Sequence, residues 1–277
     1  MRGRPAALIG AASLVAAQSS AQAPDVRVRL DAIVSLRSDG TGPASLRFYD
    51  PLGHRGVLAV TFFLEPGFRT YVTQKLQQIE NDSDQEPLEE YYVEDEGLWK
   101  VGKQFLPFGS GQILRESVLA ARGDTNLILE GLPVVFAACD GGPGKQRGYV
   151  GRIGSRIGLS FALGHHFGIA STALTYVRAP EDAPGLRRGY ERVLGFDAYR
   201  NIGSVTVRGE AVFLRSGETA RDVDEDILDA SLSFRPIPSA QLGVGVTRSV
   251  AQEKTFVRLT ASVVLDHHTT VEPLIRF

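Results

Sequence analysis

Residues 255–265, Thr-Phe-Val-Arg-Leu-Thr-Ala-Ser-Val-Val-Leu, decide the fold class of this chain. The stretch alternates between two faces, with Val257, Leu259, Ala261, Val263 and Leu265 on one and Arg258, Thr260 and Ser262 on the other. A period of two is that of a strand, in which successive side chains point to opposite sides. The stretch therefore predicts a β-strand with one apolar and one polar side.

The alternation resumes at the end of the sequence. Val271, Ile275 and Phe277 continue the apolar phase, and the last of them is aromatic. A final alternating strand that ends on Phe resembles the last strand of bacterial outer-membrane β-barrels, where it serves as a barrel-closing and assembly signal. The resemblance implies an all-β, transmembrane antiparallel barrel that interacts with the barrel-assembly machinery and with outer-membrane lipids and lipopolysaccharide.

The first residues predict a secretory signal peptide. Arg2 and Arg4 precede an apolar run from Ala6 to Ala17, and small residues follow up to Ala23. This is the order of a signal peptide, and the run is too short to span the roughly 30 Å of hydrocarbon in a bilayer. We expect a signal peptide at 1–21, with cleavage after 23 as the alternative, and a barrel over 22–277 in the outer membrane of a Gram-negative bacterium.

Composition excludes several other classes of protein. Apolar residues make up 43% of the chain and charged residues 22%, which argues against disorder. No later segment has the length and apolarity of a transmembrane helix. Cys139 is the only cysteine, so there is no internal disulfide. The net charge of −2, without a basic stripe, gives no reason to expect nucleic acid. No metal-ligand spacing or phosphate-cradling loop occurs, so neither a metal nor a cofactor is expected.

Other segments repeat the alternation. Residues 26–37 are long enough to cross a bilayer, which takes roughly 9 to 11 residues of tilted strand, and residues 56–79 read as a hairpin around Pro66-Gly67. Long polar connections, at 178–188 and 215–225, alternate with short ones, at 200–202 and 235–238. Long external loops and short periplasmic turns are typical of outer-membrane barrels. About 15 segments are counted, and because such barrels favour even numbers we expect 14 strands, with 12 or 16 as alternatives.

A second resemblance starts at Leu98. Trp99, Val101 and Phe105 alternate against Lys100, Gly102 and Gln104. Val101-Gly102-Lys103-Gln104, followed by Pro107-Phe108-Gly109, resembles porins of the phosphate-selective and siderophore-porin kind over about a dozen residues, and in those families a long loop follows. The resemblance implies a passive channel for small solutes.

The stretch from Ser110 to Gly131 is expected to be that long loop, because it is long and mixed in character. By resemblance to porins it folds into the lumen and narrows it, with Arg115, Glu116, Arg122 and Asp124 as constriction-loop candidates. The alternative is an external loop with a short helix around residues 114–121. The acidic stretch from Glu80 to Glu96 lacks the glycine of a calcium-binding EF-hand and is expected to be a solvated loop with its strand ends.

The cost of placing a charge in lipid indicates which face of each strand points towards the lumen. An Arg or Lys on the outer face at the bilayer midplane costs about 2 to 4 kcal/mol, so the charged phase is expected to point inward. The candidates for lining the lumen are Arg27, Arg29, Lys100, Gln104, Arg152, Arg208, Glu210, Asp229 and Arg258. Counted with the other inward charges, bases outnumber acids, which predicts a weak anion preference. The candidate interfacial aromatics are Tyr71, Trp99, Tyr190, Tyr199 and Phe277.

Three functions remain open from the sequence. The favoured one is a non-enzymatic porin-like channel for passive diffusion of small hydrophilic solutes. The second is a closed structural or adhesion barrel whose charges pair across a filled interior. The third is an outer-membrane lipid hydrolase using Ser160 or Ser171 with His165 or His166, although no catalytic spacing surrounds them. The oligomeric state is left open.

Overall fold

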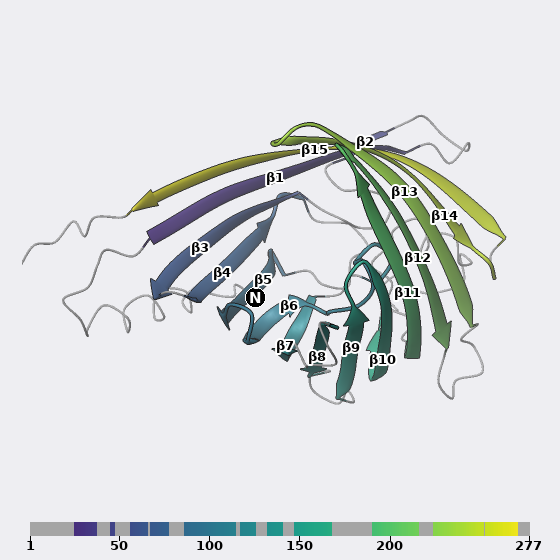
Figure 1. The fold of residues 1–277 in the computed structure, drawn as a ribbon, viewed down its shortest axis with the longest axis horizontal. Coiled ribbons are helices and arrows are strands. Elements are labelled where there is room, and N and C mark those ends of the chain that lie inside the picture. The colour runs from purple at the N-terminus through teal and green to yellow at the C-terminus, as the bar shows by residue number, and fades with distance from the viewer. Residues whose placement is uncertain are drawn as a thin grey trace, which may run out of the picture.

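A computed structural model describes residues 25–37, 45–47, 56–65, 67–77, 86–114, 117–125, 132–140, 147–167, 190–215, 224–251 and 253–270. Within these ranges all regular structure is strand (Figure 1). The strands are β1 (Asp25–Arg37), β2 (Ser45–Arg47), β3 (Val57–Glu65), β4 (Phe68–Lys75), β5 (Leu88–Asp95), β6 (Trp99–Phe105), β7 (Ser117–Thr125), β8 (Val134–Cys139), β9 (Gly148–Gly154), β10 (Ile157–Phe167), β11 (Tyr190–Ile202), β12 (Val205–Arg215), β13 (Glu225–Ile237), β14 (Ala240–Ser249) and β15 (Lys254–Thr270).

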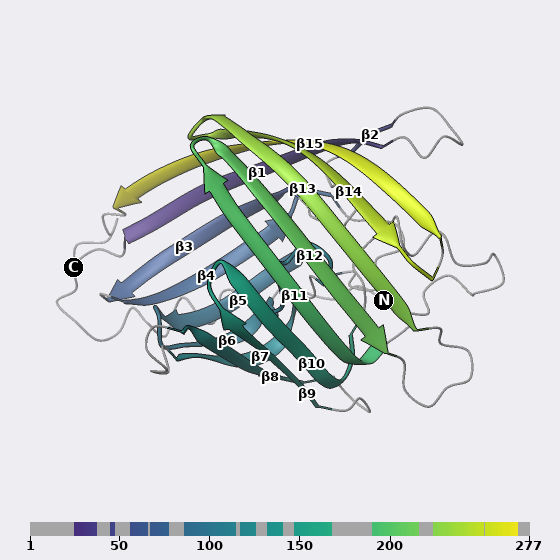
Figure 2. The ribbon, with the colours of Figure 1, turned by 45° about the vertical axis from the view of Figure 1, so that its right-hand side comes forward.

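The sheet closes on itself as an antiparallel barrel. Among the described strands, each from β3 to β15 pairs with its neighbour in sequence, β3 pairs with β1, and β1 pairs with β15. Figures 1 and 2 show β1 and β15 side by side, and their register runs without a break from Asp25 opposite Thr270 to Arg37 opposite Arg258. β2 pairs only with the end of β1, so 14 of the 15 strands form the ring. Closure leaves no unpaired sheet edge, and the expected 14-stranded barrel is confirmed.

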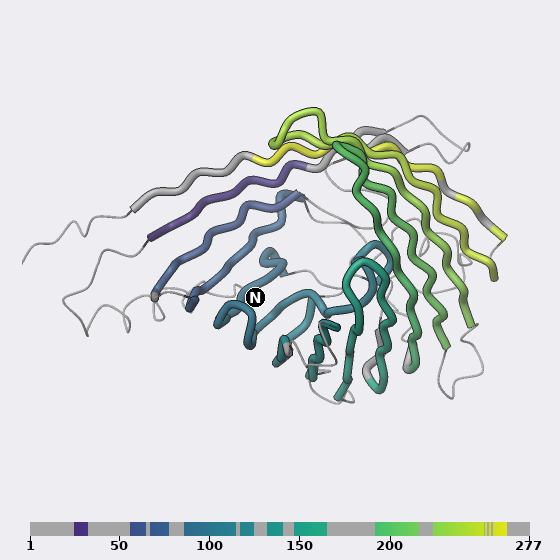
Figure 3. The backbone as a smooth tube through the Cα atoms, in the orientation of Figure 1, coloured from purple at the N-terminus to yellow at the C-terminus, as the bar shows by residue number. Residues whose placement is uncertain are grey.

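Connection lengths distinguish the two ends of the barrel. The connections β3–β4, β5–β6, β9–β10, β11–β12 and β13–β14 leave two or three residues between strands, all at the end where β1 begins and β15 finishes. We call this the short-turn end. At the opposite, long-loop end, β10–β11 and β12–β13 are separated by residues 168–189 and 216–224. The backbone trace in Figure 3 follows the same up-and-down path. Two connections depart from this pattern, because β7–β8 at the short-turn end spans residues 126–133 and β14–β15 at the long-loop end only 250–253. The other connections match the expected alternation of long loops and short turns.

Two stretches expected to be loops contain strands. β5 occupies most of the second half of 80–96, with Tyr92 and Glu94 on its inner face, and β7 occupies 117–125 within the expected loop at 110–131. The alternative of a short helix around residues 114–121 is wrong from residue 117 onward, because Leu119 and Ala120 alternate across β7. The expected signal peptide at 1–21 and the terminal residues Val271, Ile275 and Phe277 lie outside the described residues.

The polarity of the barrel is the reverse of that of a soluble protein. Large apolar side chains such as Leu232, Val244 and Leu259 are exposed on the outer face, in cross-strand register with one another. Charged side chains such as Asp229 and Arg258 are buried on the inner face. Soluble proteins do the opposite, whereas a barrel in lipid has an apolar outer band and a polar interior. Among the described residues, no helix has the length and apolarity to cross a membrane.

Candidate functional site in the barrel interior

Three carboxylates face inward in one row across adjacent strands. Asp197 on β11 lies opposite Glu210 on β12, which lies opposite Asp229 on β13. All three are buried. We call them the carboxylate row. Like charges directly opposite each other destabilise a sheet unless other groups compensate them. Each acid of the row therefore needs a hydrogen-bond donor or a base as its partner.

Arginines from other strands compensate the two outer acids of the row. Arg152 donates to Asp197 through Nε at 3.1 Å and through Nη2 at 2.6 Å. On the other side Arg258 donates to both carboxylate oxygens of Asp229, and Thr247 Oγ1 donates to Asp229 at 2.6 Å. Bidentate Arg–carboxylate pairs are stronger than single hydrogen bonds and fix the geometry of both partners.

Glycines make room for both arginines. Gly158 lies beside the Arg152–Asp197 pair, and a Cβ atom there would overlap the guanidinium. At Gly245 a Cβ would lie 2.5 Å from Arg258 Cζ. Each inward glycine therefore lets a side chain from the next strand cross over it to reach its acid.

The middle acid of the row holds a segment that runs inside the barrel. This inward segment, Leu106–Leu114, follows β6. Ser110 Oγ donates to Glu210 Oε2 at 2.6 Å, and the backbone N–H of Gln112 donates to the same oxygen at 3.0 Å. The N–H of Gly109 donates to Ser160 Oγ on β10 at 2.9 Å. Three hydrogen bonds thus tie the inward segment to the walls formed by β10 and β12.

Apolar packing fixes the same segment. Phe108, Ile113 and Leu114 are almost completely buried. They pack in one cluster with inward side chains of β7 to β13, namely Ala120, Cys139, Val150, Ala162, Val193, Val212, Leu214 and Ile227. Phe108 lies over Gly195, where a Cβ would come within 2.6 Å of its ring carbons. The inward segment therefore packs against inward side chains of seven strands of the ring, β7 to β13.

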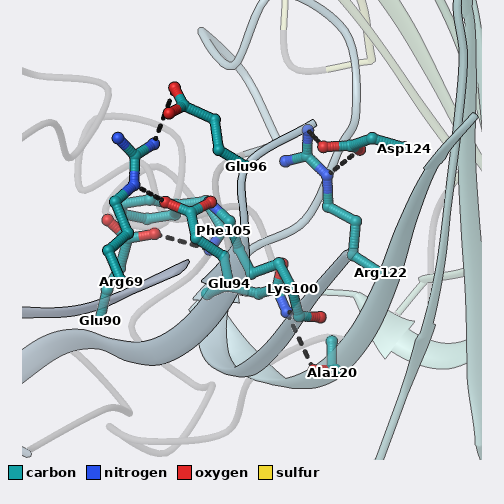
Figure 4. Close-up of polar contacts among 10 residues, drawn as sticks. Arg69, Glu90, Glu94, Glu96, Lys100, Phe105, Ala120, Arg122 and Asp124 are labelled. Carbon is teal, nitrogen blue, oxygen red and sulfur yellow. Dashed lines mark hydrogen bonds and ion pairs between the residues drawn. The ribbon is translucent and has the colours of Figure 1, made fainter. Parts of the chain in front are cut away.

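The opposite part of the wall carries a polar network, which Figure 4 shows. Arg69 Nε on β4 donates to Glu94 Oε1 on β5 at 2.5 Å, and Lys100 Nζ on β6 lies 3.4 Å from the other oxygen of Glu94. Lys100 also lies 3.9 Å from the centre of the Tyr92 ring, which packs against Tyr71. These charged and aromatic groups interact with one another and form a partly exposed patch.

The two members of most inward ion pairs differ in exposure. The side chain of Arg152 is 18% exposed and that of Asp197 0%, while Arg69 is 28% exposed and its partner Glu94 9%. Arg29 is likewise more exposed than Asp31, whereas Arg122 (24%) is slightly less exposed than Asp124 (27%), and Lys75 (1%) is less exposed than Glu89 (9%). In the larger number of these pairs the base is the more accessible partner.

All nine residues expected to line the lumen lie on the inner face, but not all of them reach an open surface. Gln104, Glu210, Asp229 and Arg258 are buried. Gln104 Nε2 donates to the carbonyl oxygens of Ala120 and Lys100 at 2.9 and 3.2 Å, so it ties β6 to β7. The members with accessible side chains are Arg27, Arg29, Lys100, Arg152 and Arg208.

The constriction-loop candidates lie elsewhere than expected. Arg122 and Asp124 are inward residues of β7 and pair with each other at 2.6 Å, so they belong to the wall. Arg115 and Glu116 lie outside the described residues. The segment that enters the lumen begins four residues before the expected loop, at Leu106 instead of Ser110.

Other sequence candidates are placed as follows. Trp99 faces outward and packs edge-to-face on Phe68, whereas Tyr71 and Tyr199 face inward and are not interfacial. The thiol of Cys139 is buried in the inner apolar cluster. Ser160 is buried beneath the inward segment, where its hydroxyl accepts the Gly109 N–H. The side chains of His165 and His166 and all of Ser171 lie outside the described residues.

Sequence reasoning missed the residues that anchor the inward segment. Phe108 and Ser110 were read only as part of a motif and of a loop, and Ser160 was considered only as a nucleophile. Pro107-Phe108-Gly109 carried the available signal, because an aromatic flanked by Pro and Gly after a strand marks a sharp change of direction. Among the described residues, no cluster of three or more His, Cys, Asp or Glu side chains is arranged to hold a metal ion.

Comparisons with known proteins give structural likeness only. No family model and no curated protein matches the sequence. Solved structures that are similar in outline include OmpTdeltaL8, a loop-deletion mutant of an outer membrane protein of Vibrio cholerae (8% identity, 87% of this chain and 99% of that chain, TM-score 0.49). Others are Salmonella typhi OmpF in complex with daunomycin (8%, 89% and 98%, 0.47) and the anion-selective porin from Comamonas acidovorans (11%, 88% and 98%, 0.46). At such similarity the site must be understood from the residues of this chain.

Proposed function

We propose that this chain is a bacterial outer-membrane channel for passive diffusion of small hydrophilic solutes, with a weak preference for anions. The observation that carries the proposal is the reversed polarity of the closed ring. Its outer face exposes Leu232, Val244 and Leu259, while its inner face holds charged groups from β1, β4 to β7, β9, β11 to β13 and β15. A ring of this kind is stable with hydrocarbon outside and water inside.

The anion preference is supported by the unequal exposure within ion pairs. Arg152 and Arg69 present their guanidinium groups to the interior, while Asp197 and Glu94 lie deeper in the wall. A permeating ion interacts most strongly with the charge that is closest and least shielded by protein. The accessible interior surface should therefore favour anions modestly. The preference is small because each paired base has an acid next to it.

The inward segment would act as the constriction. It is tied to Glu210 and Ser160 and buries Phe108, so it lies against one side of the wall. Solutes would then pass along the other side, beside the network of Arg69, Glu94 and Lys100.

A closed barrel is the second candidate, because one specific observation favours it. The apolar cluster around Phe108, Ile113 and Leu114 fills part of the interior, as in barrels that conduct nothing. A lipid hydrolase gains no such support, since the Ser160 hydroxyl is buried and accepts a backbone N–H.

Planar-bilayer recording of the refolded mature protein separates these candidates. The channel proposal predicts stepwise conductance, with a reversal potential in a salt gradient that corresponds to a mild anion preference. A folded, membrane-inserted protein that produces no steps would instead favour the closed barrel. Conductance with a cation preference would contradict the proposed anion preference but support the proposed channel.

A further inference from the structure

Arg208 differs from most of the inward bases whose side chains the structure describes. Arg235, in the inner phase of β13, also pairs with no described acid, but it donates to Gln241. Arg29, Arg69, Lys75, Lys100, Arg122, Arg152 and Arg258 each form an ion pair with an acid. Arg208 forms none with the described residues, and its Nε is buried without an acceptor. A buried donor without a partner is unfavourable, because it has lost its hydrogen bonds to water.

The carboxylate row lies beside Arg208 in the strand register, and most of its oxygens have donors. Glu210 lies two positions further along the same face of β12 and accepts from Ser110 and Gln112 through Oε2, whereas its Oε1 is buried without a described donor. Asp197 and Asp229 flank Glu210 in the carboxylate row and are bound by Arg152 and Arg258. Among the described residues, Arg208 therefore forms no hydrogen bond or ion pair with any member of the row.

Two hydroxyl groups flank this arginine. Tyr199 on β11 and Ser231 on β13 lie directly opposite Arg208. Opposite residues of an antiparallel sheet have Cβ atoms roughly 4.5 to 5.5 Å apart, so a phenol and a serine hydroxyl are placed on either side of the guanidinium. All three lie near the short-turn end, a few residues from the β11–β12 turn at Gly203 and Ser204. The described parts of this neighbourhood thus offer hydrogen-bond donors from three adjacent strands.

We propose that Arg208, Tyr199 and Ser231 form a binding subsite for a small oxyanion, a carboxylate or a phosphate, on the short-turn side of the inward segment. This subsite rests on the proposed channel function and gives it a chemical class of solute. The guanidinium fork fits two oxygens of one oxyanion, and the hydroxyls can donate to a third. Binding is weak because the carboxylate row lies next to it, and weak binding is what a conducting path requires.

Equilibrium binding to the detergent-refolded full-length mature protein tests the subsite without requiring conduction. Inorganic phosphate and acetate are titrated separately by calorimetry into the wild type, Arg208→Ala and Arg200→Ala. Arg200 lies opposite Val207 on the outer face near the same end and is the matched control. We expect Arg208→Ala to weaken binding of at least one probe by about tenfold and Arg200→Ala to leave it unchanged. Equal binding by Arg208→Ala and the wild type, or no binding of either probe to the wild type, overturns the proposal.

Two milder variants keep the test valid if Arg208→Ala does not fold. Arg208→Lys retains the charge but loses the fork, and Tyr199→Phe removes only a hydroxyl. Each should weaken binding severalfold, and wild-type affinity in both would overturn the subsite. The two proposals fail separately. A protein that conducts but binds neither probe through Arg208 is a channel without this subsite, whereas one that binds through Arg208 and never conducts contradicts the channel.

Discussion

Glu210 and Ser110 are joined by a hydrogen bond of 2.6 Å although 100 positions separate them in the sequence. The same oxygen of Glu210 accepts the N–H of Gln112, so one carboxylate on β12 binds two residues of the inward segment that lie two positions apart. The segment leaves β6 and returns to β7, and its position therefore depends on a strand on the far side of the apolar cluster. Glu210 is therefore one anchor of the inward segment, beside Ser160 and the apolar cluster around Phe108.

Replacing Glu210 by Ala should loosen the inward segment. The change leaves the Ser110 hydroxyl and the Gln112 N–H without their acceptor, which costs about 1 to 3 kcal/mol of unfolding free energy. Single-channel recordings should show a larger or noisier conductance, and urea unfolding in lipid should show the lost stability. Ser110→Ala is the matched partner variant. If the two losses simply add in the double variant, the bond does not hold the segment.

Gly195→Val should disturb the segment from the other side. A Cβ at Gly195 would come within 2.6 Å of the Phe108 ring, so a larger side chain displaces Phe108 from its position over Gly195. We expect a loss of about 1 to 3 kcal/mol, as for overpacked cores, together with altered conductance. Gly209→Ala is the control, because the nearest atom to a Cβ there is 3.8 Å away. Wild-type behaviour of Gly195→Val would mean that Phe108 is not held at this point.

Arg258 and Arg208 should respond differently to substitution. Arg258 is buried with Asp229, so Arg258→Ala leaves an uncompensated buried carboxylate and should cost about 3 to 5 kcal/mol of unfolding free energy. Arg208 has no such pair within the described part of the chain. Arg208→Gln should therefore shift the reversal potential towards cations at a smaller cost in stability. The opposite ranking of the two variants in urea unfolding would contradict this assignment.

Charge on the outer face should be costly in lipid. Leu232 faces outward on β13 and its neighbour Ser231 faces inward. Leu232→Arg should destabilise the protein in liposomes by about 2 to 4 kcal/mol, if this position lies near the bilayer midplane, and Ser231→Arg by clearly less. Unfolding titrations of both variants in the same lipid provide the comparison. Equal costs would indicate that the two faces meet the same medium.

The sequence predicted the parts of the fold that depend on local alternation. The apolar phase of Val257 and Leu259 and the tight turn at Pro66-Gly67 were sufficient for strands and hairpins, because side-chain period and turn chemistry are local properties. β7 was missed because Arg122-Gly123-Asp124 has the composition of a loop, although Arg122 and Asp124 share its inner face.

The candidate site was predicted less completely for a physical reason. Which residues face inward follows from strand phase, but which of them pair follows from the register between strands that are distant in sequence. The Arg258–Asp229 ion pair and the hydrogen bond from Ser110 to Glu210 both depend on this register. The difference between buried Arg258 and unpaired Arg208 therefore could not be read from strand phase alone.

Spin-label accessibility along β13 in liposomes tests the central claim most directly, namely that lipid lies outside the ring and water inside. Single cysteines replace Leu228, Ala230, Ser231, Leu232 and Ser233 in a Cys139→Ala background. Labels at the three outward positions, 228, 230 and 232, should be accessible to oxygen dissolved in the bilayer, and those at 231 and 233 to a water-soluble nickel chelate. Accessibility to the chelate at 228, 230 and 232, or the absence of a two-residue period, would contradict it.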